Sequence, residues 1–143
     1  SSFDIDYIRN YSAKIRRLGV KHIFVLGQRP HWKPYLYKTI MKSYWYSTPR
    51  YIPGHQDNEL LALGEKFESR LKSNELFDYV EQRSAFCNTD GCLTYLGDDR
   101  KTGLITFDDA HLRPFASVYL AEKQLAPLII NALRGEEANA AAH

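Results

Sequence analysis

Three features are missing from this sequence, and each absence narrows the class of protein. The net charge is only +2, and no basic stripe is interleaved with aromatic residues, so we expect no nucleic-acid partner. No apolar stretch approaches the roughly 18 residues needed to span a bilayer. No internal repeat or low-complexity linker interrupts the chain before its tail. With 143 residues, 44% of them hydrophobic and 25% charged, the sequence predicts one globular domain.

The two ends of the chain also lack features of a complete protein. The sequence opens with Ser-Ser-Phe, its only methionine is Met41, and no signal peptide is recognisable. We therefore expect a piece of a longer protein. The tail at 136–143 is polar or alanine-only, which is typical of disorder or of an expression-vector remnant. The predicted domain accordingly spans 1–135.

The two cysteines frame a tight turn with the sequence Cys87-Asn88-Thr89-Asp90-Gly91-Cys92. Asp90-Gly91 is a strong turn signal, and such a turn can bring the two Cα atoms within disulfide range. A zinc site needs about four ligands, and only His111 is a further candidate near this pair. The spacing favours a disulfide, and hence an oxidising compartment, over two free thiols in the cytosol.

Helical and strand-like segments alternate along the chain and predict an α/β fold. Apolar residues recur at helical spacing from Ile5 to Leu18, with Gly19 as the expected stop. The branched run at 20–26 predicts a buried strand, and a helix leading into such a strand is typical of a parallel sheet. Further predicted segments are helices beginning near 34, 56 and 114, strands at 76–80, 92–96 and 104–107, and a loop over 44–55.

The last predicted helix begins at Pro114. Its apolar residues are expected to face inward: Phe115, Val118, Leu125, Ile129 and Leu133. Pro127 lacks a backbone N–H and is expected to kink or break this helix.

The most informative segment is Phe107-Asp108-Asp109-Ala110-His111-Leu112. Asp108 and His111 are expected in the turn after the strand at 104–107, where α/β folds usually place their chemistry. A carboxylate that orients an imidazole is the second half of a Ser-His-Asp triad, in which the imidazole acts as general base toward a hydroxyl. The same spacing also occurs where an aspartate accepts backbone N–H bonds at the start of a helix, so both interpretations stay open.

The first half of such a triad, a serine on a strained turn, is not recognisable. Every serine in the sequence lacks the strand–turn–helix setting that a nucleophile needs. His31 and Trp32 lie in the loop after the first predicted strand. There they could form a substrate wall or pack as ordinary loop residues.

Read in order, these segments resemble the C-terminal half of the SGNH hydrolase-like domain that is fused to bacterial membrane acyltransferases. The resemblance covers roughly residues 3–134. It rests on the strand that ends in Gly27-Gln28-Arg29-Pro30, the close cysteine pair, and the Asp-x-x-His-Leu block before the last helix. Proteins of this family modify cell-surface polysaccharides with acetyl or other acyl groups.

The resemblance implies a flavodoxin-like three-layer α/β/α fold, of which this chain holds only the C-terminal part, in the periplasmic domain of a bacterial inner-membrane protein. It implies Asp108 and His111 as two catalytic triad members, with the serine and the oxyanion-hole residues preceding Ser1. The implied partners are a cell-envelope polysaccharide, such as lipopolysaccharide, and the membrane acyltransferase domain of the same protein. No metal or organic cofactor is implied. The sequence does not separate transfer from hydrolysis.

Two further expectations concern partners. A half domain with two parallel strands would leave one sheet edge unpaired, which favours self-association through that edge. The alternative to an enzyme is a non-catalytic α/β domain that binds a glycan or another partner through aromatic faces. The residues that would supply those faces are Tyr44, Trp45, Tyr46 and Tyr51, although core packing explains them almost as well.

Overall fold

The computed structural model describes residues 2–142, with side-chain environments from Asp4 onward, and groups the chain into two compact units. Unit 1 combines 1–28 with 58–81, and unit 2 combines 29–57 with 82–143. The sequence predicts a single domain over 1–135. Each unit draws on two separate stretches of the chain, and hydrophobic periodicity, a local property, does not indicate such a grouping.

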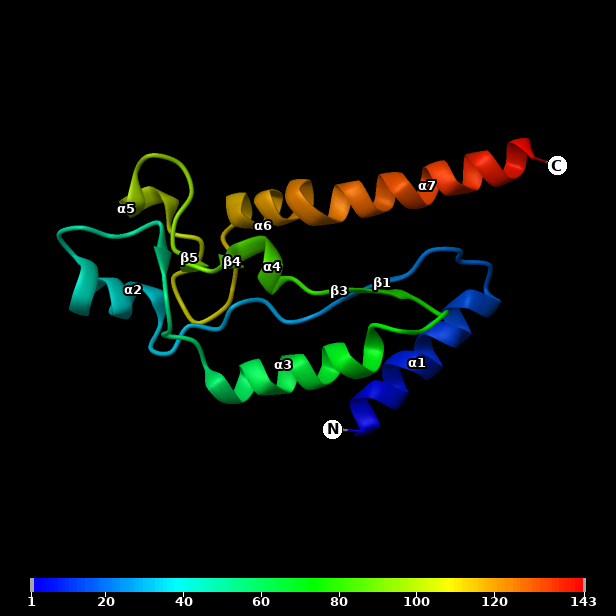
Figure 1. The fold of residues 1–143 in the computed structure, drawn as a ribbon, viewed down its shortest axis with the longest axis horizontal. Helices are drawn as coiled ribbons and strands as arrows, with labels where there is room; N and C mark the ends of the chain where they lie inside the picture. Colours follow the sequence, from blue (N-terminus) through cyan, green and yellow to red (C-terminus); the bar gives the residue numbers. More distant parts are fainter. Residues whose placement is uncertain (1, 143) are drawn as a thin grey trace. The chain divides into compact units, whose positions relative to one another are not determined.

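Unit 1 consists of two helices and a two-stranded parallel sheet (Figure 1). Its elements are α1 (Ser2–Arg17), β1 (Phe24–Leu26), α3 (Asn58–Leu71) and β3 (Asp78–Val80). Val25 lies opposite Tyr79 in the parallel register. The predicted alternation of helix and parallel strand is therefore confirmed. The first strand is shorter than the predicted run at 20–26, because Val20 is exposed and pairing begins only at Phe24.

The core of unit 1 is small. Ile5, Leu71 and Phe77 are its buried members, one from each helix and one from the segment before β3. The Arg16 guanidinium donates a 2.9 Å hydrogen bond to the carbonyl of Leu76 and so fixes the end of α1 against that segment. The helix then stops at Gly19, whose φ of +92° is open mainly to glycine, as predicted.

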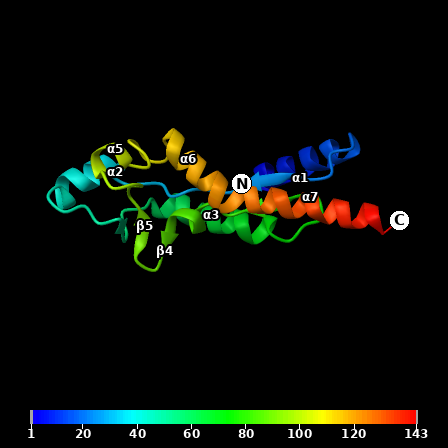
Figure 2. The same cartoon turned by 90° about the horizontal axis from the view of Figure 1, so that it is seen from above.

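Unit 2 contains a three-stranded antiparallel sheet with the strand order β2–β5–β4, together with most of the helices (Figures 1 and 2). Its elements are α2 (Leu36–Thr39), the π-helical turn η1 (Ile40–Tyr44), β2 (Tyr51–Ile52), α4 (Arg83–Phe86), β4 (Cys87–Asn88), β5 (Gly91–Leu93), α5 (Arg100–Gly103), α6 (Pro114–Leu120), the π-helical turn η2 (Ala121–Leu125) and α7 (Ala126–Ala141). The strand β2 falls inside the segment at 44–55 that the sequence predicts as loop. Its two residues are too few to carry an alternating pattern.

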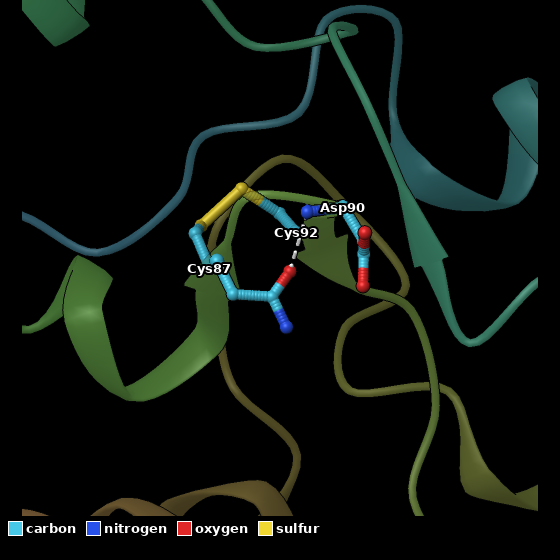
Figure 3. The surroundings of a disulfide bond; sticks show 4 residues. Cys87, Asp90 and Cys92 are labelled. Carbon is cyan, nitrogen blue, oxygen red and sulfur yellow. Dashed lines mark hydrogen bonds between the residues drawn. A yellow bond between two sulfur atoms is a disulfide. The ribbon is translucent and has the colours of Figure 1, made fainter.

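The cysteine turn forms a covalently closed hairpin in unit 2. Strands β4 and β5 pair so that Cys87 lies opposite Cys92, and the two residues form a disulfide with a Cα–Cα distance of 4.0 Å (Figure 3). The amide of Asp90 donates a 2.8 Å hydrogen bond to the side-chain oxygen of Asn88 within the turn. The predicted disulfide is therefore confirmed.

The C-terminal part of the chain differs from the prediction. Helix α6 begins at Pro114 as expected, but α6, η2 and α7 follow one another as one helical rod (Figures 1 and 2). Pro127 changes the helical hydrogen bonding without ending the helix, because the π-helical turn immediately precedes it.

The predicted disordered tail at 136–143 is helical as far as Ala141, where α7 ends. Alanine has the highest helix propensity of all residues, so this alanine-rich stretch can extend a helix already nucleated upstream. His143 lies outside the described residues. The expected inward face is only partly present: Phe115 packs against the core of unit 2 and Leu125 is half-buried. Val118, Ile129 and Leu133 are exposed instead.

Unit 2 holds the larger core, and this core supports the segment before Asp108. Trp32, Leu36, Ile52, Phe86 and Ile105 are among its fully buried members. None of the helices within residues 2–142 is both long enough and apolar enough to cross a membrane.

Candidate active site

The segment that carries Asp108 and His111 is a tight loop anchored at both ends. Thr106 and Leu112 form an antiparallel bridge, and the amide of Arg113 donates a 2.8 Å hydrogen bond to the carbonyl of Ile105. Thr106 is buried at the base of the loop, whereas the His111 side chain is 83% exposed. The loop therefore rests on the core of unit 2 and presents the imidazole to solvent.

The carboxylate of Asp108 organises this loop. Its Oδ1 accepts hydrogen bonds from the amides of Ala110 at 3.0 Å and His111 at 2.8 Å, and from the hydroxyl of Thr106 at 2.9 Å. Its Oδ2 lies 2.6 Å from Nδ1 of His111. The geometric prediction that Asp108, rather than Asp109, pairs with the imidazole of His111 is confirmed.

This pairing favours one tautomer of the neutral imidazole. An ionised carboxylate can only accept hydrogen bonds, so the proton between the two groups belongs to Nδ1 of His111. The neutral ring then carries its lone pair on Nε2. Within residues 2–142, Asp108 is the hydrogen-bonding partner of this imidazole, which leaves Nε2 available to accept a proton. A general base needs this arrangement.

The hydrogen bonds around Asp108 also favour its ionised form. Desolvation alone would raise this pKa, but hydrogen bonds from the amide and imidazole of His111 outweigh it, with smaller contributions from Thr106 and Ala110. Together they hold the pKa of Asp108 far below its ordinary value of 3.8. The carboxylate is therefore charged throughout the neutral range.

Sequence reasoning missed the role of Thr106. Its hydroxyl donates to Asp108 Oδ1 and accepts a 3.2 Å hydrogen bond from the amide of Asp108. The carboxylate of Asp108 is therefore bound by the buried hydroxyl of Thr106 and by the exposed imidazole of His111. The spacing Thr-x-Asp, which allows a local hydroxyl-to-carboxylate turn, is the signal that could have revealed it.

Asp109 contacts a different histidine. Its carboxylate Oδ2 lies 3.7 Å from Nδ1 of His31, and its backbone carbonyl accepts a 2.8 Å hydrogen bond from the amide of Trp32. The amide of Leu36 likewise donates to the carbonyl of Asp108, at 3.4 Å. Backbone hydrogen bonds thus join the loop at 31–36 to the loop at 106–112 that carries Asp108 and His111, which we call the site loop. Trp32 itself is a core residue that is only 2% exposed, which makes it unavailable as a substrate wall.

Asp108, Asp109 and His111 each offer one potential metal-ligating atom, and these atoms lie within 4.8 Å of one another. Nδ1 of His111 and Oδ2 of Asp108 already bind each other at 2.6 Å. A cation that used both atoms would have to break that bond. The donor set fits an imidazole–carboxylate pair better than a metal centre.

The four aromatic residues that could have formed a glycan-binding face do not form a single exposed one. Tyr44 and Tyr51 are partly buried against the core of unit 2. Trp45 is 50% exposed and Tyr46 is 96% exposed. No hydrogen bond joins a serine to His111 in the described part of the chain, where the imidazole pairs with Asp108.

The fold and this loop define an α/β protein that presents an oriented Asp–His pair to solvent. No protein-family model matches the sequence, and no curated protein matches it either. Among solved structures, the fold is similar to the periplasmic domain of the lipopolysaccharide acetyltransferase of Salmonella ser. Paratyphi A, with a TM-score of 0.69 and 22% sequence identity. The match covers 90% of this chain and 51% of that one, so this chain spans about half the length of the Salmonella structure.

Proposed function

We propose that this chain is the C-terminal part of an SGNH hydrolase-like domain that transfers or removes acetyl-type groups on a cell-envelope polysaccharide. The single observation that carries the proposal is the 2.6 Å contact between Asp108 Oδ2 and His111 Nδ1, which leaves Nε2 free at an exposed position. The likeness in fold to a lipopolysaccharide acetyltransferase periplasmic domain supports the same reading, as does the disulfide between Cys87 and Cys92.

The proposed chemistry is acyl transfer through a serine that lies outside this sequence. Nε2 of His111 would take the proton of the serine hydroxyl as that oxygen attacks the acyl carbonyl, and would then return the proton to the leaving group. Asp108 would hold the ring in the Nδ1-protonated form and stabilise the imidazolium. A sugar hydroxyl as the second acceptor gives transfer, and water gives hydrolysis. No metal or organic cofactor takes part in these steps.

The same comparison supports a periplasmic setting. A periplasmic position would account for the disulfide, since this compartment is oxidising. The acyl donor would reach the site from a membrane acyltransferase domain of the same protein. The two described strands of unit 1 each have one unpaired edge, which further strands of the flavodoxin-like sheet, or a second copy of the chain, would cover.

The first test measures the chain as it stands. With a base but no positioned serine, the 143-residue chain should hydrolyse p-nitrophenyl acetate no faster than its His111→Ala variant. Turnover above that control that also disappears when one serine of this chain is replaced by alanine would mean that this serine is the nucleophile, and the assignment of the serine to another segment would be wrong.

The second test uses the natural full-length polypeptide and measures acetylation of its polysaccharide. Asp108→Asn should reduce transfer on the order of 10³-fold to 10⁴-fold, as in other Ser-His-Asp triads, because the imidazole loses the partner that fixes its tautomer. Asp109→Asn is the matched control and should have little effect, since the backbone bond from Trp32 to Asp109 survives the substitution. Equal losses in the two variants, with folding intact by circular dichroism, would contradict the triad.

A further inference from the structure

The helical segment at 36–44, formed by α2 and η1, has an outward face of unusual composition. Leu36, Thr39 and Ile40 point into the core of unit 2 and are buried. Apart from Ser43, the exposed side chains of this segment and of its flanking residues 35, 45 and 46 are aromatic, basic or thioether groups: Tyr35, Tyr37, Lys38, Met41, Lys42, Trp45 and Tyr46. We call this set the aromatic–basic face. It combines large apolar side chains with positive charge on one side of a short helix.

The segment that carries this face lacks acidic and amide side chains. From 29 to 55 the sequence contains no Asp, Glu, Asn or Gln. Carboxylate and amide side chains are the usual hydrogen-bonding partners of sugar hydroxyls, so a neutral glycan would find few acceptors here. A positively charged surface without acidic groups is complementary to an anionic partner.

Helix α5 places two more basic residues beside this face, directly after the exposed Asp98 and Asp99. Arg100 lies over the ring of Trp45, with 5.7 Å between the guanidinium carbon and the ring centroid. Arg100 and Lys101 line a small hollow together with Ile40 and Trp45. The nearby carboxylate of Asp99 accepts a 2.8 Å hydrogen bond from the amide of Lys101 and so caps α5. In both views α2 and α5 lie at the same end of unit 2, away from the C-terminal end of α7 (Figures 1 and 2).

Two of the aromatic side chains pack beside a lysine, a combination that is common at a membrane–water interface. Nζ of Lys38 lies 5.1 Å from the ring centroid of Tyr35 and 5.9 Å from that of Tyr37. Tryptophan and tyrosine gather at the boundary between lipid headgroups and acyl chains, and lysine and arginine bind anionic headgroups. A helix with Trp, Met and Tyr beside lysines and without acidic residues matches the composition of interfacial helices.

We propose that the aromatic–basic face docks onto the surface of an anionic phospholipid bilayer. Trp45, Tyr46 and Met41 insert at the headgroup level, while Lys38 and Lys42 bind the phosphates. The segment that docks begins at Leu36, whose amide is bonded to the carbonyl of Asp108, so docking would hold the imidazole of His111 at a fixed place relative to the membrane. This inference uses no catalytic step and stands independently of the proposed function.

The two tryptophans of the chain make a direct test possible, because Trp32 is 2% exposed and Trp45 is 50% exposed. Adding vesicles of phosphatidylglycerol and phosphatidylcholine to the 143-residue chain should shift the Trp45 emission to the blue. Lipids brominated on their acyl chains should quench that emission. Trp45→Phe should abolish both changes, since the buried Trp32 is shielded. Vesicles of pure phosphatidylcholine should bind far more weakly.

Charge variants sharpen the test by measuring vesicle sedimentation. Lys38→Gln with Lys42→Gln should lower the partition coefficient by roughly 25-fold, the product of about fivefold for each lysine near an anionic surface. The matched control is Lys14→Gln with Arg17→Gln, which removes the same charge from exposed positions of α1 and should change binding much less. Equal losses in the two double variants would reduce the effect to net charge and overturn the proposal. Binding to soluble dextran sulfate without a vesicle-induced shift of Trp45 would overturn it as well.

Discussion

Unit 2 contains two tight loops of similar length that are closed in opposite ways. The hairpin at 87–92 is closed by a covalent bond between two cysteines that lie opposite each other. The loop at 106–112 is closed by a backbone bridge and by one carboxylate, Asp108, that accepts four hydrogen bonds. The first arrangement fixes only shape. The second fixes shape and also keeps an imidazole nitrogen exposed, so reactivity remains in the loop that lacks the covalent bond.

The largest expected loss of stability comes from a substitution in the turn of the disulfide hairpin. Gly91 has a φ of +126°, and a Cβ at this position would lie 2.3 Å from backbone atoms of Ile52 in the neighbouring strand. Gly91→Ala should therefore lower the free energy of unfolding by about 3 kcal/mol, measured by urea denaturation. Gly97→Ala is the matched control: its φ is +74°, but no atom lies within 4 Å of its added Cβ, so it should cost only about 1 kcal/mol. Equal costs would mean that strain alone, rather than the contact with Ile52, governs the turn.

Removing the covalent bond should have the next largest effect. Replacing Cys87 and Cys92 together by serine should destabilise the chain by about 2 kcal/mol, since the bond closes a short loop with a sequence separation of 5. The pair formed by Asp108 and His111 should survive, because its hydrogen bonds involve no residue of the hairpin. Intact mass with and without reduction before alkylation confirms the starting state. Two thiols that alkylate freely without reduction would contradict the disulfide.

The hydrogen-bonded loop can be tested at its buried end. Thr106→Val removes a hydroxyl that donates to Asp108 Oδ1 and accepts from the Asp108 amide, in a side chain that is nearly isosteric. We expect a loss of about 1 kcal/mol and a rise in the pKa of Asp108, followed by NMR. Thr94→Val serves as a matched control, since Thr94 is also fully buried but its hydroxyl donates to Pro49. An unchanged pKa of Asp108 in Thr106→Val would remove Thr106 from the site.

The smallest expected effect is on the pH dependence of stability, to which Asp108 of the loop at 106–112 should contribute and the disulfide should not. Folding lowers the pKa of Asp108 below its ordinary value of 3.8, so the ionised carboxylate stabilises the fold at neutral pH. That contribution should fade as the pH falls below about 4 toward the folded pKa. It should amount to less than about 1 kcal/mol, because the pair is exposed to solvent. The difference in unfolding free energy between the wild type and Asp108→Asn should shrink on acidification. A difference that stays constant across this range would contradict the shift.

The sequence predicts those features whose determinants lie close together along the chain. The disulfide and the pair of Asp108 with His111 depend on spacings of five and three residues, and both are present. The helices α1 and α3 follow from periodicity and from Gly19. Features that depend on distant segments were not predictable. The contact of His31 with Asp109 requires a backbone bond between 32 and 109, and β2 is defined only by its pairing with β5.

The backbone bonds that fasten the loop at 31–36 to the site loop also act as reporters. The amides of Trp32 and Leu36 donate to the carbonyls of Asp109 and Asp108, so neither amide can exchange its hydrogen with solvent until the site loop opens. Both positions belong to a part of the sequence that is about seventy residues away from the loop they sense. The rate of hydrogen–deuterium exchange at these two amides therefore reports how readily the loop at 106–112 opens, without a substrate or an activity assay.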